Sequence, residues 1–187
     1  MRADTLWVRH GESTWNRAGV MQGQTHWPAL TSRGGRQARA VVDELLDYRP
    51  VRIVSSDLRR AAETAHIIGA RLALPVEFTA LLRERCWGVF EGRPAAEGRL
   101  AESALKADQP VPHGESRDDV VARLRRLAPA LTTADGPTVV VTHGDVIRAA
   151  LSMWQAHRAD DTPPENGCIV PIPAELMNPH STRSRQA

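Results

Sequence analysis

The sequence has little lysine and little cysteine, and each scarcity excludes a class of chemistry. Lys106 is the only lysine among 187 residues, and Cys86 and Cys168 are the only cysteines. A P-loop needs a lysine after its glycines, so that kind of phosphate site is excluded, and Schiff-base chemistry is disfavoured. The cysteines lie too far apart for a zinc motif or a disulfide framework. Arg93 follows Cys86 one residue too late for the Cys-x5-Arg loop of cysteine phosphatases. With these cysteine motifs excluded, we expect Cys86 and Cys168 to be reduced and semi-buried.

Long apolar runs and massed charge are also missing. No run is long enough to cross a membrane and the N-terminus has no signal-peptide pattern, so we expect a cytoplasmic protein without a membrane partner. The 24 basic and 22 acidic residues are spread along the chain, which gives little support to a nucleic-acid partner. The length fits a single domain over residues 1–172, followed by a flexible tail over 173–187, where the sequence is polar and unpatterned.

Two apolar runs each end in His-Gly, and they carry the clearest chemical signal. Residues 5–8 and 138–142 have the composition of buried strands, and they lead into His10-Gly11 and His143-Gly144. Glycine lets the backbone come close to a ligand, and open α/β sheets bind ligands at the carboxyl ends of their strands. The pattern predicts two imidazoles in one site, although a histidine after an apolar run is more often a structural residue.

Strands and helices alternate along the rest of the chain. Further short strands are expected at 51–54, 75–78 and 168–172, the last at a sheet edge because it contains a proline. Apolar residues at helical spacing predict helices that begin near Thr31, Ser56, Ser116 and Val146. Residues 14–24 are expected to form a loop over the site. The alternation predicts an α/β fold, a three-layer α/β/α sandwich with a mainly parallel central sheet.

Five short motifs follow one another through this pattern. They are Arg9-His10-Gly11-Glu12-Ser13 with Asn16, Ser56-Asp57-Leu58-Arg59-Arg60-Ala61 through Thr64-Ala65, Leu82-Arg83-Glu84 with Gly88 and Glu91-Gly92, Gly114-Glu115-Ser116, and Thr142-His143-Gly144. In order and spacing they resemble the histidine phosphatase superfamily, in its phosphoglycerate-mutase-like branch. The resemblance spans Thr5 to Ile172 and is closest to small bacterial phosphatases such as glucosyl-3-phosphoglycerate or α-ribazole phosphatase.

The resemblance implies a reaction and the residues that perform it. It implies a phosphomonoesterase that forms a phosphohistidine on His10, with Glu84 as proton donor. It also implies that Arg9, Arg60 and His143 bind the phosphoryl group, where Arg60 rather than its neighbour Arg59 fits the motif. Substrate contacts are implied at Asn16, Gln22 and Gly23, and the helix that starts beside Gly144 suits an anion.

Elementary chemistry supports these implied roles. A neutral imidazole is a competent nucleophile, and the planar guanidinium of arginine matches the geometry of a phosphoryl group. A cluster of cations does the electrostatic work of a metal ion, so we expect neither a metal nor another cofactor. A zinc site made from His10, His143 and Glu84 is the competing interpretation, disfavoured by the arginines around it. The expected partner is a small phosphorylated metabolite, and a homodimer is left open.

Two departures from the family pattern bear on function. His26 stands where relatives commonly have an aspartate, with one extra residue before Leu30, so substrate specificity cannot be copied from a relative. The segment between Gly92 and Pro112 is shorter than the insertion that phosphoglycerate mutases carry there. It leaves little chain to exclude water from a phosphoenzyme, which favours a phosphatase over a mutase. A phosphoglycerate mutase is the first alternative, and a catalytically silent phospholigand-binding protein is the second. Four further residues are candidates to line the pocket, although each is more often a packing or surface residue: Trp15, Trp27, Trp87 and His113.

Overall fold

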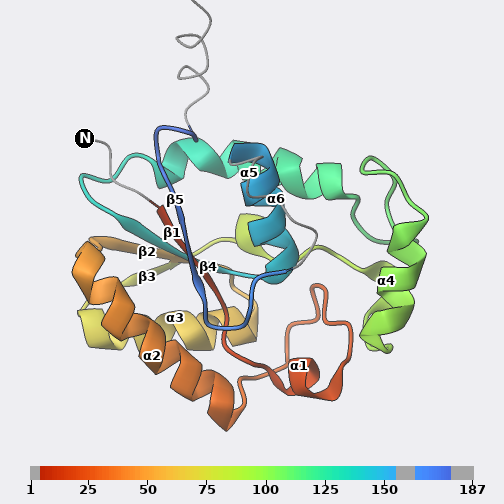
Figure 1. Ribbon diagram of the computed structural model, residues 1–187, viewed down its shortest axis with the longest axis horizontal. Helices are drawn as coiled ribbons and strands as arrows, with labels where there is room; N and C mark the ends of the chain where they lie inside the picture. The colour runs from red at the N-terminus through yellow and green to blue at the C-terminus, as the bar shows by residue number, and fades with distance from the viewer. Residues whose placement is uncertain (1–4, 155–162, 178–187) are drawn as a thin grey trace, which may run out of the picture.

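The chain folds into three layers, with helices on both faces of a central sheet (Figure 1). The computed structural model describes residues 5–154 and 163–177. The strands are β1 (Thr5–Arg9), β2 (Arg52–Ser55), β3 (Val76–Phe78), β4 (Thr138–Thr142) and β5 (Ile169–Ile172). The helices are α1 (Thr14–Ala18), α2 (Ser32–Tyr48), α3 (Arg59–Leu72), α4 (Ala95–Ser103), α5 (Arg117–Leu131) and α6 (Gly144–Trp154), with short 3-10 helices at Ala80–Leu82 and Gly88–Phe90.

The strand order is β3-β2-β4-β1-β5, and every neighbouring pair is parallel except β1 with β5. The predicted α/β class with a mainly parallel sheet is therefore confirmed, and the proline-containing strand lies at the edge as expected. The register pairs Arg9 of β1 with Thr142 of β4. The residues that come next, His10 and His143, consequently leave the sheet side by side at its carboxyl edge.

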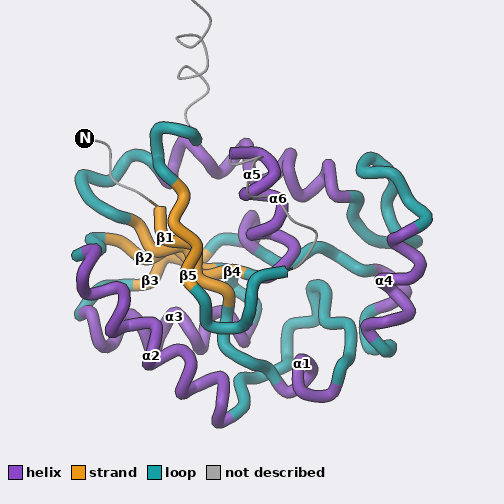
Figure 2. Tube along the Cα trace, in the orientation of Figure 1, coloured by secondary structure: helices purple, strands orange, loops and turns teal. Residues whose placement is uncertain are grey.

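Alternate residues of the strands build two separate apolar cores, as the pleat of a strand requires. Trp7 points to the layer formed by α5 and α6, whereas Leu6 and Val8 point to the layer formed by α2 and α3. All three side chains are fully buried. Figure 2 shows the strands between these two helical layers, with α1 and α4 beside the sheet at one end of the molecule. Within the described residues, no helix has the length and apolar character that crossing a membrane requires.

Three local expectations were wrong. Residues 14–18 form the short helix α1 instead of loop, because Ser13 caps it and Asn16 returns the hydrogen bond in a capping box. Ser56 does not cap α3, which begins at Arg59 without a side-chain cap. The polar tail does not start at Pro173, since Ala174 and Met177 are buried and the Thr5 hydroxyl donates to the Met177 sulfur. The remaining residues of the expected tail lie outside the described part of the chain.

Candidate active site

Three strand ends converge on one buried cluster. His10 follows β1 and His143 follows β4, and their ring centroids are 5.1 Å apart in an edge-to-face contact. Ser56 follows β2, and its hydroxyl lies 2.8 Å from Nε2 of His143. The histidines are 2% and 0% exposed. The sheet thus brings the two expected imidazoles together. It also places Ser56, which was expected to cap a helix, against His143.

The His10 ring is held in one tautomer. Its Nδ1 atom lies 2.7 Å from the carbonyl oxygen of Gly11, and a carbonyl can only accept, so Nδ1 carries the proton. The other nitrogen, Nε2, is then the one with a free electron pair. Burial lowers the pKa of His10 well below its usual value, and the charges of Arg60 and Arg9 act in the same direction. The ring is therefore neutral at neutral pH, which a nucleophilic imidazole requires.

A small cavity of about 150 Å³ opens beside this cluster, and we call it the strand-end cavity. Most of the sequence-predicted site residues line it: Arg9, His10, Asn16, Gln22, Gly23, Arg60, Glu84 and Gly144. His143 does not line the cavity; it lies behind His10 and contacts it through the ring. Of the four aromatic and histidine candidates, Trp15 and Trp87 contribute to the wall, whereas Trp27 and His113 do not.

Two arginines line this cavity and have guanidinium N–H groups available to a ligand. Arg60 is fully buried and donates to the carbonyl oxygens of Gly23 and Thr25 at 2.8 and 3.0 Å. Arg9 donates to the carbonyl oxygen of Pro164. The Nε atom of each guanidinium is buried, and no hydrogen-bond partner reaches it from the described part of the chain. Buried donors are normally satisfied, so this arrangement fits an anion in the cavity that completes the set.

Adjacent arginines in the sequence have opposite environments at the start of α3. Burial lowers the pKa of Arg60 to about 10, which still leaves it charged at neutral pH. Arg59 is exposed and forms an ion pair with Glu63 at 2.8 Å, one helical turn away. Arg59 is therefore a solvated surface residue, whereas Arg60 is a buried cation beside the cavity.

Glu84 is a carboxyl group prepared to hold a proton. Burial raises its pKa to about 7, and the nearby charge of Asp145 adds to that rise. Hydrogen bonding from the Arg85 backbone and the charges of Arg60 and Arg9 oppose it. Its sequence neighbour Arg83 pairs with Asp57. Glu84 is left facing the cavity with a pKa near the working pH, which suits an acid-base catalyst.

Two charged residues of the cavity wall were missed by the sequence analysis. Asp145 lies in the first turn of α6, where its carboxylate accepts from the Trp87 indole at 3.0 Å and from Arg148 at 3.0 Å. Arg99 reaches the cavity from α4. The position of Asp145 directly after His143-Gly144 was a usable signal. Arg99 had none, because the segment around it shows weak periodicity and the contact is made only by the tertiary fold.

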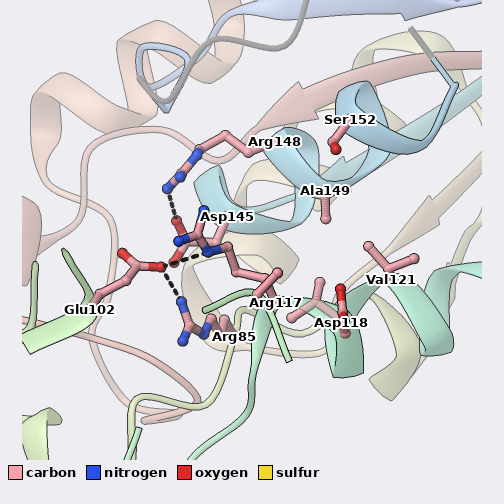
Figure 3. A pocket seen from close by; sticks show the side chains of 11 residues that line it. Arg85, Glu102, Arg117, Asp118, Val121, Asp145, Arg148, Ala149 and Ser152 are labelled. Carbon is pink, nitrogen blue, oxygen red and sulfur yellow. Dashed lines mark hydrogen bonds and ion pairs between the residues drawn. The ribbon is translucent and has the colours of Figure 1, made fainter. Parts of the chain in front are cut away.

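A larger neighbouring cavity, of about 400 Å³, shares Asp145 with the strand-end cavity (Figure 3). Its arginines are already neutralised, since Arg85 and Arg117 both contact Glu102 and Arg148 contacts Asp145. None of the described residues that line it is a histidine. The strand-end cavity is therefore the better candidate for phosphoryl chemistry.

The competing zinc interpretation finds no support in the geometry. Within residues 5–154 and 163–177, no group of three or more histidine, cysteine, aspartate or glutamate side chains is placed to hold a metal ion.

Comparison with known proteins defines the class to which this fold and cavity belong. The chain belongs to the histidine phosphatase superfamily (branch 1), whose family model matches residues 6–175. This confirms the family expected from the five motifs.

Particular relatives make the likeness more specific. The chain is 38% identical over 176 residues to a glucosyl-3-phosphoglycerate phosphatase of Mycobacterium tuberculosis, covering 81% of this chain and 75% of the relative. It is 38% identical over 165 residues to a metal-independent phosphoserine phosphatase of Arabidopsis thaliana, covering 81% and 69%. The solved structure of a mycobacterial glucosyl-3-phosphoglycerate phosphatase with VO3 matches at a TM-score of 0.81 and 32% identity, over 90% of this chain and 92% of that one. The expectation of a phosphatase of this superfamily is confirmed.

Proposed function

We propose that this histidine phosphatase hydrolyses the phosphomonoester of a small metabolite through a phosphohistidine on His10. One observation carries the proposal: the imidazole has its proton fixed on Nδ1 and its free electron pair on Nε2, in a cavity that also holds Arg9, Arg60 and Glu84. The substrates named for two relatives, glucosyl-3-phosphoglycerate and phosphoserine, are both small phosphorylated metabolites.

In the first half-reaction, Nε2 of His10 attacks phosphorus and the ester P–O bond breaks. Glu84 transfers its proton to the leaving oxygen, so the product is a neutral alcohol instead of an alkoxide. Arg9 and Arg60 stabilise the charge that spreads over the equatorial phosphoryl oxygens in the transition state. The phosphorylated ring is cationic, and the Gly11 carbonyl oxygen, which accepts from Nδ1, stabilises it.

The second half-reaction regenerates the enzyme. Glu84 is now a carboxylate and takes a proton from a water molecule, whose oxygen attacks phosphorus. The P–N bond breaks, the electron pair returns to Nε2 of His10, and inorganic phosphate leaves. His143 contacts the ring of His10 and is itself held by a hydrogen bond with the Ser56 hydroxyl. We therefore propose that it positions His10, in addition to the phosphoryl contact that the family resemblance implies.

The charges of the cavity account for catalysis without a metal ion. Arg9 and Arg60 supply fixed positive charge where a divalent ion acts in other phosphoryl-transfer enzymes. The wall around that charge is completed by the remaining expected substrate contacts, Asn16, Gln22, Gly23 and Gly144. The Ser13 hydroxyl donates to the Gln22 side chain at 2.7 Å, which fixes the loop on which the wall depends.

A phosphatase assay after exhaustive chelation tests this proposal. We expect wild-type enzyme to release inorganic phosphate from p-nitrophenyl phosphate and from alkyl phosphates, and rapid quenching to trap acid-labile, base-stable phosphate on the protein. Activity that a chelator abolishes and a divalent ion restores would contradict the metal-free mechanism. Interconversion of 2- and 3-phosphoglycerate without phosphate release would identify a mutase, and binding without any turnover would identify a silent phospholigand-binding protein.

A further inference from the structure

Helix α4 is fixed in place over one side of the strand-end cavity. Its approach is tied to the loop after α1 by backbone hydrogen bonds from Met21 to Arg93 and from Ala95 to Gly19, both of 2.8 Å. Gly98 is buried, and a Cβ atom there would lie 2.9 Å from Met21 and 3.2 Å from Trp87. This close packing leaves no room for the helix to turn about its axis without a clash.

The fixed orientation decides which side chains of α4 face the cavity. Ala95 and Arg99 are four residues apart, so they lie on the same face of the helix, and both line the cavity. Arg99 is exposed, in contrast to the fully buried Arg60. It therefore stands at the mouth, whereas the arginines assigned to the phosphoryl group lie deeper.

The charge of Arg99 is not neutralised by the residues that the structure describes. No ion pair joins it to a carboxylate there, and the two nearest acids of α4 are occupied elsewhere. Glu97 pairs with Arg93 at 4.0 Å, and Glu102 is engaged by Arg85 and Arg117 (Figure 3). Burial is the main cause that lowers the pKa of Arg9; Glu84 and Asp145 raise it, and Arg99 lowers it by the smallest amount, so the two cations lie close enough for a weak repulsion. An anion between them would relieve that repulsion.

We propose that Arg99 is a specificity-determining residue that binds a second anionic group of the substrate, carried on the alcohol side of the phosphoester. This inference rests on the proposed phosphatase function and names the class of substrate for the same cavity. The cavity holds about 150 Å³, so the alcohol portion of a substrate must extend outward from His10 and past the mouth. The class is a phosphomonoester whose alcohol bears a carboxylate or a second phosphate.

Matched substrates test this assignment. 3-Phosphoglycerate and glycerol 3-phosphate differ only in a carboxylate that replaces a hydroxymethyl group, and glucose 1,6-bisphosphate against glucose 6-phosphate adds a second phosphate. We expect Arg99→Ala to lower kcat/KM by about 10- to 100-fold for the anionic member of at least one pair, mainly through KM. The neutral members should change less than about threefold. The pair that responds identifies the second anion as carboxylate or phosphate.

Arg93→Ala is the matched control. Arg93 is also an exposed arginine beside α4, but it pairs with Glu97 and does not line the cavity, so we expect both members of each pair to be unaffected. Equal loss for neutral and anionic substrates in Arg99→Ala would place Arg99 on the phosphoryl group and overturn the inference. No change in either pair would overturn it as well. Failure of the proposed function is a separate result, because wild-type enzyme would then release no phosphate from any of these substrates.

Discussion

The deep end and the mouth of the strand-end cavity are built on different principles. At the deep end, His10 and His143 follow adjacent strands, and Arg60 is locked to two carbonyl oxygens. At the mouth, Trp15 lines the wall from α1 and packs edge-to-face on Trp27, which lies outside the wall and is 59% exposed, with ring centroids 4.7 Å apart. The two histidines of the deep end directly follow strands of the central sheet, whereas Trp15 and Arg99 of the mouth stand on the short helices α1 and α4 beside that sheet.

This contrast separates what the reaction needs from what the substrate needs. Phosphoryl transfer requires charges placed to within fractions of an ångström, and the ends of paired strands supply that precision. Recognition of the alcohol varies from one phosphatase to another, and it falls to segments whose replacement does not disturb the sheet. Changes at the deep end should therefore abolish turnover of every substrate, and changes at the mouth should reorder substrates.

The largest effect should come from removing the nucleophile. His10→Ala should lower kcat by about 10³-fold or more for every phosphomonoester, because no other described residue that lines the cavity carries an imidazole. Steady-state assays on aryl and alkyl phosphates measure this, and circular dichroism checks that the fold is intact. Trapped phosphate should disappear from the variant. Retention of near-wild-type activity would exclude the mechanism proposed above.

The next effect separates the two half-reactions. Glu84→Gln should slow phosphorylation by alkyl phosphates by about 10²- to 10⁴-fold, because an alkoxide needs a proton in order to leave. p-Nitrophenol leaves without one, so the variant should still form phosphoenzyme from its ester and then stall, since no base activates water. Rapid-mixing experiments should show a burst of p-nitrophenol equal to the enzyme concentration. The absence of a burst, with alkyl and aryl substrates slowed alike, would remove Glu84 from the reaction.

Sequence reasoning succeeded where chemistry is tied to regular structure. The strands that end in His10 and His143 were predictable because a buried parallel strand leaves a continuous apolar run, which His-Gly then interrupts. The helix expected to begin near Ser116 is present as α5, and Ser116 forms a capping box with Asp119 at its start. Such features depend on residues within a few positions of one another.

Features that depend on contacts between distant segments were not predictable. Helix α1 has five residues, too few to show a helical period, so its existence rests on the Ser13 and Asn16 capping box alone. Ser56 had the chemistry of a cap, but the sheet places it against His143, where its hydroxyl has a better-buried partner. The burial of Met177 follows from the position of β5 at the sheet edge, which no local pattern encodes.

A smaller effect should distinguish two neighbouring arginines. Arg60→Ala should lower kcat/KM by about 10²- to 10³-fold, as expected for the loss of a charge-assisted contact to the transition state. Arg59→Ala removes only an exposed ion pair with Glu63 and should change kcat/KM less than about twofold. Parallel kinetics on one alkyl phosphate, with thermal unfolding of both variants, measure the difference. Equal effects of the two substitutions on kcat/KM would contradict the assignment of Arg60 to the phosphoryl group.

The smallest effect should be a shift of the pH profile at the boundary between the deep end and the mouth. The proton-donating form of Glu84 is lost as pH rises through its pKa of about 7, so kcat for alkyl phosphates should fall above that pH. Burial is the main cause of the raised pKa and Asp145 the second, so Asp145→Asn should lower the pKa of Glu84 and move the basic limb toward acid by about one unit or less.

Arg148→Ala is the control, because it removes the ion-pair partner of Asp145 and leaves the Asp145 carboxylate in place. The basic limb should not move toward acid in that variant, whereas an acid shift shared by both variants would trace the effect to disrupted packing around Trp87. Profiles for p-nitrophenyl phosphate in pre-steady-state phosphorylation should stay the same in all three proteins, since its leaving group needs no proton.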